Sequence, residues 1–310
     1  MMKNKLLRIL SLLFALVIMF SAVSCDLGKE EQTLIQSVNS PTEAPTNAPT
    51  EAPTDAPTDV DEPYVFDLSH VPEYDGKNAV YILNNNIPVF EKDEITTQSF
   101  EKYEELDSLG RCTLTIACIG KDIMPTDKRG SVSSVTPTGW HSSQIYERSH
   151  LIGWQLTGEN ANKQNLITGT FTLNGEMQTF EDMVASFIKE TNYHVMYRVT
   201  PVFEENNLLA SGVHMEGYSV EDSGESICFN VYIYNVQNDY IIDYATGDSK
   251  LSDDSPIKDA TYVINKNNGK FHKADCYNVA AMNESNKEYT NKTREELIAE
   301  GKIPAGCCNP

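Results

Sequence analysis

Basic residues are scarce in this 310-residue sequence, which has 24 lysines and arginines against 45 aspartates and glutamates. The formal net charge of −21 argues against a protein that holds a polyanion through its overall field, since nucleic-acid binders usually present a basic surface. The deficit is uneven, because residues 64–255 carry −17 while the segment 119–165 within them carries +1. A local positive patch in that segment is therefore compatible with the sequence.

Long apolar runs are also lacking, and only the N-terminal one suggests a membrane. Three basic residues in the first eight positions precede an apolar run from Ile9 to Phe20, which is shorter than the roughly 20 residues of a membrane-spanning helix. Small residues then lead directly to Cys25, an arrangement that resembles a bacterial lipobox. We interpret residues 1–24 as a lipoprotein signal peptide and Cys25 as the lipidated residue; an ordinary signal peptide with a chance cysteine is the alternative.

Residues 25–63 lack the composition of a folded domain. Pro-Thr-Glu-Ala, Pro-Thr-Asn-Ala and Pro-Thr-Asp-Ala units repeat with a period of four, and residues 26–63 contain nine acids and one lysine. Dense proline favours an extended polyproline conformation, and like charges extend the chain further. The sequence therefore predicts an acidic stalk that holds a folded part, residues 64–310, away from a membrane.

The folded part reads as rich in strands. The segments 112–119, 194–203, 208–220 and 227–234 contain many β-branched and aromatic residues, and Asn206-Asn207 suggests a hairpin between two of them. Apolar residues recur at helical spacing from Thr179 to Glu190, with Thr179 as a candidate cap. Antiparallel strands with few helices predict the α+β class.

The residues most suited to chemistry lie between Thr126 and Thr170. This segment contains Glu147-Arg148-Ser149-His150 and, after an apolar stretch, Asn165-Leu166-Ile167-Thr168-Gly169-Thr170. Together with Pro137-Thr138-Gly139-Trp140-His141 and Tyr197-Arg198-Val199-Thr200-Pro201, these motifs resemble the DNA/RNA non-specific endonucleases. That ββα-metal (His-Me finger) family includes secreted and DNA-entry nucleases of Gram-positive bacteria. The resemblance covers residues 79–249 and implies an antiparallel sheet with a ββα-metal core.

The resemblance implies a general base and phosphate-binding residues. Hydrolysis of a phosphodiester needs a base for water and stabilisation of developing charge, and a neutral imidazole suits the first task. His150 matches the base of the family motif Asp-Arg-Gly-His. Glu147 and Ser149 stand where that motif has Asp and Gly. We expect these two differences to change the hydrogen bonds around the site more than they change the reaction. Basic side chains are candidates for binding phosphate, as a guanidinium can do through two bonds: Arg148, Arg129, Lys128 and Lys163.

The resemblance also implies a hard divalent ion, Mg²⁺ or Mn²⁺, which prefers oxygen ligands. The matching position for the metal-binding asparagine is Asn165, with Asn160 and Asn162 as fallback candidates, and Glu181 would orient metal-bound water. Each residue has a structural alternative. An asparagine in a loop commonly serves turn geometry, Glu181 could be a solvated helix residue, and Arg129 could be an ordinary surface residue.

Residues 256–310 form a separate pattern, similar to the small metal-binding domain at the N-terminus of the Ada DNA-repair protein. His272, Cys276 and Cys308 match ligand positions and are candidate zinc ligands. Ala305 stands where a fourth cysteine is expected, and the additional Cys307 is adjacent to Cys308, which makes joint binding of one zinc awkward. A Cys276–Cys308 disulfide is the alternative, favoured by an oxidising exterior.

The sequence therefore predicts an extracellular, membrane-anchored, non-specific nuclease of a bacterium, acting on DNA and RNA without an obligate protein partner. A catalytically inactive receptor for DNA uptake would keep the fold but not the chemistry, and the retained Arg148, His150 and Asn165 argue against it. A non-enzymatic surface adhesin fits the anchor and stalk, but the folded part has no sequence repeats to support it.

Overall fold

The computed structural model describes residues 64–142 and 145–310. The predicted signal peptide, the lipidated Cys25 and the stalk lie outside the described residues. Within the described ranges, no helix is both long and apolar enough to cross a membrane.

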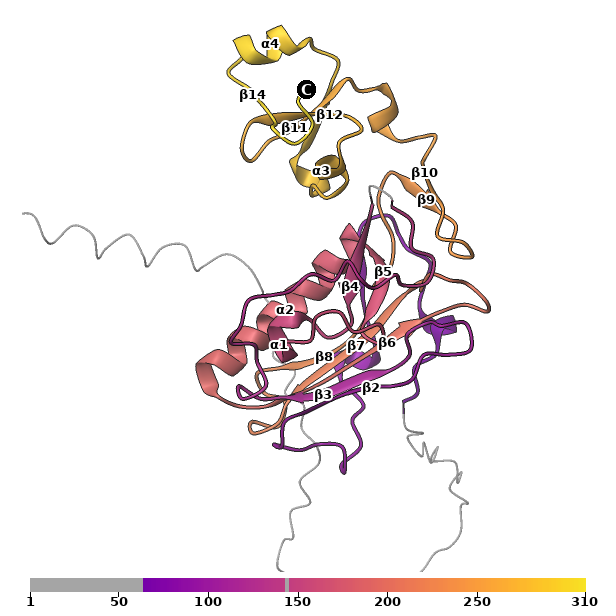
Figure 1. Ribbon diagram of the computed structural model, residues 1–310, viewed down its shortest axis with the longest axis vertical. Coiled ribbons are helices and arrows are strands. Elements are labelled where there is room, and N and C mark those ends of the chain that lie inside the picture. Colours follow the sequence, from indigo (N-terminus) through magenta and orange to yellow (C-terminus); the bar gives the residue numbers. More distant parts are fainter. Residues whose placement is uncertain (1–63, 143–144) are drawn as a thin grey trace, which may run out of the picture.

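A six-stranded antiparallel sheet, in the order β1-β8-β7-β6-β3-β2, forms the centre of the fold (Figure 1). Its strands are β1 (Val80–Ile82), β2 (Phe100–Tyr103), β3 (Thr115–Ile119), β6 (Val195–Val202), β7 (Gly212–Ser219) and β8 (Cys228–Tyr234). The four longest lie within the four segments predicted as strands, and β6 and β7 form the predicted hairpin around Asn206-Asn207. The α+β class is confirmed.

One long helix, α2 (Phe171–Thr191), packs on one face of this sheet. Thr170 caps it, because the Thr170 hydroxyl accepts a hydrogen bond from the N–H of Leu173 at 3.0 Å. The prediction that the helix begins near Thr179 is wrong by more than two turns. The polar stretch before Thr179 hides the first part of the apolar stripe, in which Leu173 and Met177 are buried against the sheet.

The helix is the third part of a ββα unit. The strands β4 (Tyr146–His150) and β5 (Leu166–Thr170) pair antiparallel in a two-stranded sheet of their own, and β5 continues directly into α2. A short helix, α1 (Trp154–Thr157), lies in the connection between β4 and β5 and contacts α2. The motif predicted to carry the chemistry therefore lies on β4, with His150 as its last residue.

The C-terminal residues form a further sheet of four strands in the order β13-β11-β12-β14. Its elements, with the β9–β10 hairpin that precedes them, are β9 (Tyr240–Ile242), β10 (Ser249–Leu251), β11 (Tyr262–Asn265), β12 (Lys270–Lys273), α3 (Tyr277–Ala280), β13 (Lys287–Thr290), α4 (Arg294–Ala299) and β14 (Ile303–Pro304). Gln237 donates to the carbonyl of Ala280 at 2.9 Å, which connects α3 to the segment that follows β8 of the central sheet. In Figure 1 the C-terminal part stands apart from the central sheet, beyond β9 and β10.

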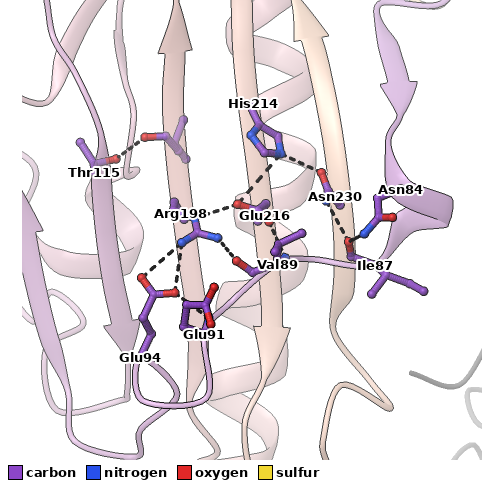
Figure 2. Close-up of polar contacts among 11 residues, drawn as sticks. Asn84, Ile87, Val89, Glu91, Glu94, Thr115, Arg198, His214, Glu216 and Asn230 are labelled. Carbon is purple, nitrogen blue, oxygen red and sulfur yellow. Dashed lines mark hydrogen bonds and ion pairs between the residues drawn. The ribbon is translucent and has the colours of Figure 1, made fainter. Parts of the chain in front are cut away.

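The face of the central sheet away from α2 carries a buried polar network (Figure 2). Side chains alternate along a strand, so apolar residues of β6 to β8 face α2 while Arg198, His214, Glu216 and Asn230 face the other way. Arg198 Nε donates to Glu216 Oε2 at 2.7 Å, and Glu216 Oε1 accepts from the N–H of Val89 at 2.6 Å. These bonds attach the segment 84–94 to the sheet.

We expect Arg198→Ala to lower the free energy of unfolding by about 3–5 kcal/mol, because Glu216 would remain buried without its partner. Lys102→Ala is the control, since Lys102 forms an ion pair with Glu104 on the surface and should contribute within about 1 kcal/mol. Urea unfolding of both variants measures the difference, and equal losses would contradict a dominant role for the buried pair.

Candidate active site

His150 lies at the end of β4 and is almost fully buried, at 6% exposure. Its Nε2 lies 2.8 Å from the carbonyl oxygen of Asn160, which can only accept a hydrogen bond. Nε2 therefore carries the proton, and Nδ1 carries the electron pair that accepts a hydrogen bond. The Nη2 atom of Arg129 lies 3.4 Å from Nδ1, on the side of the ring away from Asn160. The backbone contact thus selects the tautomer in which Nδ1 can accept a proton.

The pKa of His150 is lowered from its ordinary value of 6.5. Burial is the largest cause because it disfavours the charged imidazolium, the hydrogen bond to Asn160 opposes it, and the nearby charge of Arg129 lowers the pKa further. A lowered pKa keeps the imidazole neutral at pH 7, which is the form that a general base requires.

A small pocket of about 200 Å³ opens beside His150. The residues that line it come from the 129 loop, the start of α1 and the exposed side of α2: Arg129, His150, Gly153, Trp154, Gln155, Asn174, Gln178 and Glu181. The ββα unit and the loop that carries Arg129 therefore bring together three of the predicted site residues, His150, Arg129 and Glu181. Asn174 is a fourth polar group in the pocket, which the sequence reasoning missed.

Asn174 has the orientation expected of a metal ligand. Its Nδ2 donates to Glu147 Oε2 at 2.7 Å, which fixes the side-chain amide. No hydrogen bond to Asn174 Oδ1 occurs within the described residues, so this hard oxygen is available in the pocket. Burial is the largest influence on Glu147 and raises its pKa, while the bond from Asn174 opposes the rise. Glu147, which departs from the family motif, thus holds the asparagine that lines the pocket.

Asn165 cannot hold the metal as predicted. Its side chain is fully buried, its Oδ1 accepts from the N–H of Ile152 at 2.8 Å, and its Nδ2 donates to the Ile152 carbonyl at 2.9 Å. Both polar atoms of the amide are therefore used by the backbone that follows His150. Asn165 extends the β4–β5 pairing through its side chain, which is the turn role that the sequence left as an alternative.

Glu181 lies in the pocket as expected from its place in the sequence, and it is 8% exposed. Burial raises the pKa of Glu181 to about 8, because the carboxylate is removed from water without a strong cationic partner. Gly153 makes room for this carboxyl, since a Cβ at position 153 would lie 2.1 Å from Glu181 Oε2. A buried carboxyl of this kind is suited to a site that receives a cation, although its predicted role in orienting water stays a prediction.

The other predicted basic residues are not among those that line the pocket. Arg148 makes structural contacts outside the pocket. Its guanidinium lies 4.0 Å from the Trp140 ring centre, and its Nε donates to the Val135 carbonyl at 2.6 Å. Its prediction as a phosphate clamp is therefore corrected. Lys128 and Lys163 are exposed on the surrounding surface.

Asn160 positions Arg129 as well as His150. While its backbone carbonyl binds the imidazole, its Oδ1 accepts from the N–H of Gly130 at 2.7 Å. The loop that carries Arg129 is thereby attached to the same residue that orients the base. The fallback prediction of Asn160 as a metal ligand is corrected, since its Oδ1 already binds this backbone.

A second group of chemically active side chains lies in the C-terminal part. His272 of β12, Cys276 before α3, and Cys307 and Cys308 near the chain end form a Cys/His cluster whose ligand atoms all lie within 4.8 Å of one another. The structure brings the three predicted ligands together and adds Cys307, which the sequence reasoning considered awkward.

Comparisons with known proteins place part of the chain in a known family. Residues 91–221 match the family model of the DNA/RNA non-specific endonucleases, a range that contains His150, Asn174 and Glu181. The structure of NucA from Streptococcus agalactiae with no metal bound is 26% identical, covers 56% of this chain and 87% of its own, and has a TM-score of 0.50. NucA with a magnesium ion bound has the same identity and coverage, with a TM-score of 0.49. The Sda1 nuclease with a bound zinc ion is 25% identical, and the match covers 49% of this chain and 80% of that nuclease, with a TM-score of 0.41.

The ββα unit and its pocket thus define a nuclease fold. The chain carries a DNA/RNA non-specific endonuclease domain, which confirms the family and the enzyme class predicted from the sequence, a metal-dependent endonuclease.

Substituting the two asparagines separately should separate their roles. We expect Asn174→Ala to raise the Mg²⁺ concentration for half-maximal cleavage roughly 10–100-fold or more, with little change in melting temperature, because a ligand oxygen is lost. Asn165→Ala should instead lower the free energy of unfolding by about 1–3 kcal/mol for each backbone group of Ile152 left unpaired. Metal titrations and thermal unfolding of both variants test this, and a normal metal requirement in Asn174→Ala would contradict the reassignment.

Proposed function

We propose that the pocket hydrolyses phosphodiester bonds in DNA and RNA without sequence specificity, with His150 as the general base. The observation that carries the proposal is the position of His150 in the pocket lining, where Nδ1 lies 3.4 Å from Arg129 Nη2 while Nε2 is committed to Asn160. Incubation of supercoiled plasmid and of RNA, each with and without EDTA, tests it. Full activity in excess EDTA would overturn the metal requirement.

In this proposal each residue of the pocket has a separate role in the reaction. His150 Nδ1 accepts a proton from water, and the backbone bond to Asn160 holds the ring while it does so. Arg129 donates to phosphate oxygens near the same nitrogen. The donors present fit Mg²⁺ or Mn²⁺: Asn174 Oδ1 and Glu181 would hold the ion, and the ion would supply positive charge at the phosphate.

The cellular setting of this activity follows from the N-terminal sequence. We propose that Cys25 is lipidated and that residues 25–63 hold the enzyme outside a bacterial, Gram-positive cell membrane. The nuclease domain would then comprise residues 64–255, and residues 256–310 a zinc module that uses His272, Cys276 and Cys308 among its ligands. NucA, the similar solved structure, is itself a streptococcal protein, which supports the bacterial setting.

A catalytically inactive receptor for DNA uptake is the second function considered. It would need the pocket's phosphate-binding residues but not a base held in one tautomer, so the fixed orientation of His150 favours the enzyme. The plasmid assay separates the two, because a receptor would bind DNA without cutting it.

We expect His150→Ala to reduce cleavage by about 10²–10⁴-fold while binding of nucleic acid and the melting temperature change little, because only the base is lost. His141→Ala is the matched control, since His141 is exposed and contacts the carbonyl of Thr246 at 3.0 Å, outside the pocket. Single-turnover cleavage and DNA binding are measured for both. More than about a tenth of normal activity in His150→Ala would exclude it as the base.

The pH dependence of cleavage should report the lowered pKa of His150. The base acts in its neutral form, so kcat/KM should be full above the pKa and fall as the pH drops through it, with a midpoint below 6.5. Arg129→Met should move that midpoint upward, because one charge that disfavours the imidazolium is removed. Profiles between about pH 5 and 8 at saturating Mg²⁺ give both midpoints, and an unchanged or lower midpoint in the variant would be contrary to this explanation.

A further inference from the structure

The Cys/His cluster contains four potential ligands, and their number decides what kind of zinc site it is. Three protein ligands leave one position of a tetrahedral zinc open for water or substrate, as in catalytic sites, whereas four close the site and make it structural. His272, Cys276 and Cys308 alone would give the open type. The position of Cys307 therefore determines the chemistry of the C-terminal module.

Cys307 lies at ligand distances from the rest of the cluster. Its Sγ is 3.3 Å from His272 Nδ1, 3.5 Å from Cys276 Sγ and 4.0 Å from Cys308 Sγ. Zinc bonds of about 2.3 Å to sulfur and 2.0–2.1 Å to nitrogen, at tetrahedral angles, separate two sulfurs by roughly 3.8 Å and a sulfur from a nitrogen by roughly 3.5 Å. The distances around Cys307 agree with those of one zinc shared among the four groups.

The chain end provides this arrangement without a cysteine at position 305. Ala305 is buried at 2% exposure, and its N–H donates to the Phe271 carbonyl at 2.9 Å, which places the chain end beside β12. The turn that follows exposes Cys307 and leaves Cys308 half-buried, so that both adjacent sulfurs face His272 and Cys276. The N–H of Lys273 donates to Cys308 Sγ at 3.3 Å, which favours the thiolate that a metal requires.

We infer that Cys307 supplies the fourth ligand of a closed, structural Cys₃His zinc site, in place of the cysteine absent at position 305. Binding would release protons from three thiols and leave a neutral imidazole as the fourth ligand. Because the ligands come from β12, the start of α3 and the chain end, the ion would join segments that are held together by backbone hydrogen bonds and a small apolar core. This inference rests on the zinc module proposed above and is independent of the nuclease chemistry.

A disulfide within the Cys/His cluster is the competing outcome, and the distances between the sulfurs show which cysteines it can join. The Cys276 and Cys307 sulfurs lie 3.5 Å apart, so oxidation can join these two as well as Cys276 and Cys308. Such a bond would consume two ligands and abolish the zinc site. Thiol counting and mass spectrometry of the full chain therefore distinguish the two states directly.

Cobalt substitution of the full-length protein tests the ligand set. Thiolate-to-cobalt absorption reports only this site, since the nuclease pocket offers oxygen and nitrogen donors. We expect one tetrahedral Co²⁺ or Zn²⁺ per chain. Cys307→Ser should lose about one third of the thiolate absorption. It should also weaken zinc affinity by more than the roughly 10–100-fold that is typical of residues which only hydrogen-bond a metal ligand. Asp275→Asn, an exposed neighbour of Cys276, is the control and should keep both.

A rescue experiment separates a ligand from a residue needed only for folding. Adding Ala305→Cys to the Cys307→Ser chain should restore the absorption and the zinc affinity, because the ligand count returns to four. Unchanged cobalt spectra in Cys307→Ser, absence of stoichiometric zinc, or a native Cys276–Cys307 disulfide would each overturn the inference. Plasmid cleavage by Cys307→Ser should stay near normal. If the zinc inference is wrong, the cobalt and zinc measurements will contradict it, whereas if the proposed nuclease function is wrong, the plasmid assay of the unmodified chain will.

Discussion

The hydrogen bond between His150 Nε2 and the carbonyl of Asn160 is the interaction on which the site depends. A neutral imidazole can carry its proton on either nitrogen, and this hydrogen bond leaves Nδ1, beside Arg129, as the nitrogen that can accept a proton. Asn160 is held by the same loop contact that brings Arg129 beside Nδ1. Orientation of the base and placement of the nearby cation are therefore determined by a single residue between β4 and β5, rather than by the motif residues alone.

The net charge of the chain and the charge of the basic residue beside His150 have opposite signs. The chain is strongly acidic, and Arg129 is the one lysine or arginine that lines the pocket beside His150 within the described residues. Salt screens exposed charges beyond about 10 Å at 0.1 M, so the acidic surface need not prevent contact with a polyanion at physiological ionic strength. In the proposed mechanism, binding depends on a few short-range donors and on a divalent ion rather than on the overall field of the protein.

Buried polar groups serve two different purposes on the two sides of the central sheet. On the face away from α2, Arg198 and Glu216 are paired and hydrogen-bonded, so their charges are satisfied and they attach the N-terminal segment. On the α2 side, Glu181 is buried without a comparable partner and its pKa is raised to about 8. A carboxyl buried without an ion-pair partner is costly to ionise, and its presence in a pocket is typical of a functional site rather than of a core.

The sequence by itself determined the α+β class, the four long strands and the family, and it singled out His150 as the candidate base, because alternation of apolar residues and a dense local motif are properties of neighbouring positions. It could not distinguish Asn165 from Asn174, since both lie in polar surroundings and differ only in what the folded backbone places opposite them. Only the tertiary structure decided that the Asn165 amide pairs with Ile152 while Asn174 Oδ1 stays available in the pocket. The same holds for Cys307, whose proximity to His272 arises because the chain end lies against β12, and for Arg148, which stacks on Trp140 instead of facing the pocket. Side-chain direction and long-range proximity depend on packing between distant segments, and sequence patterns carry no record of either.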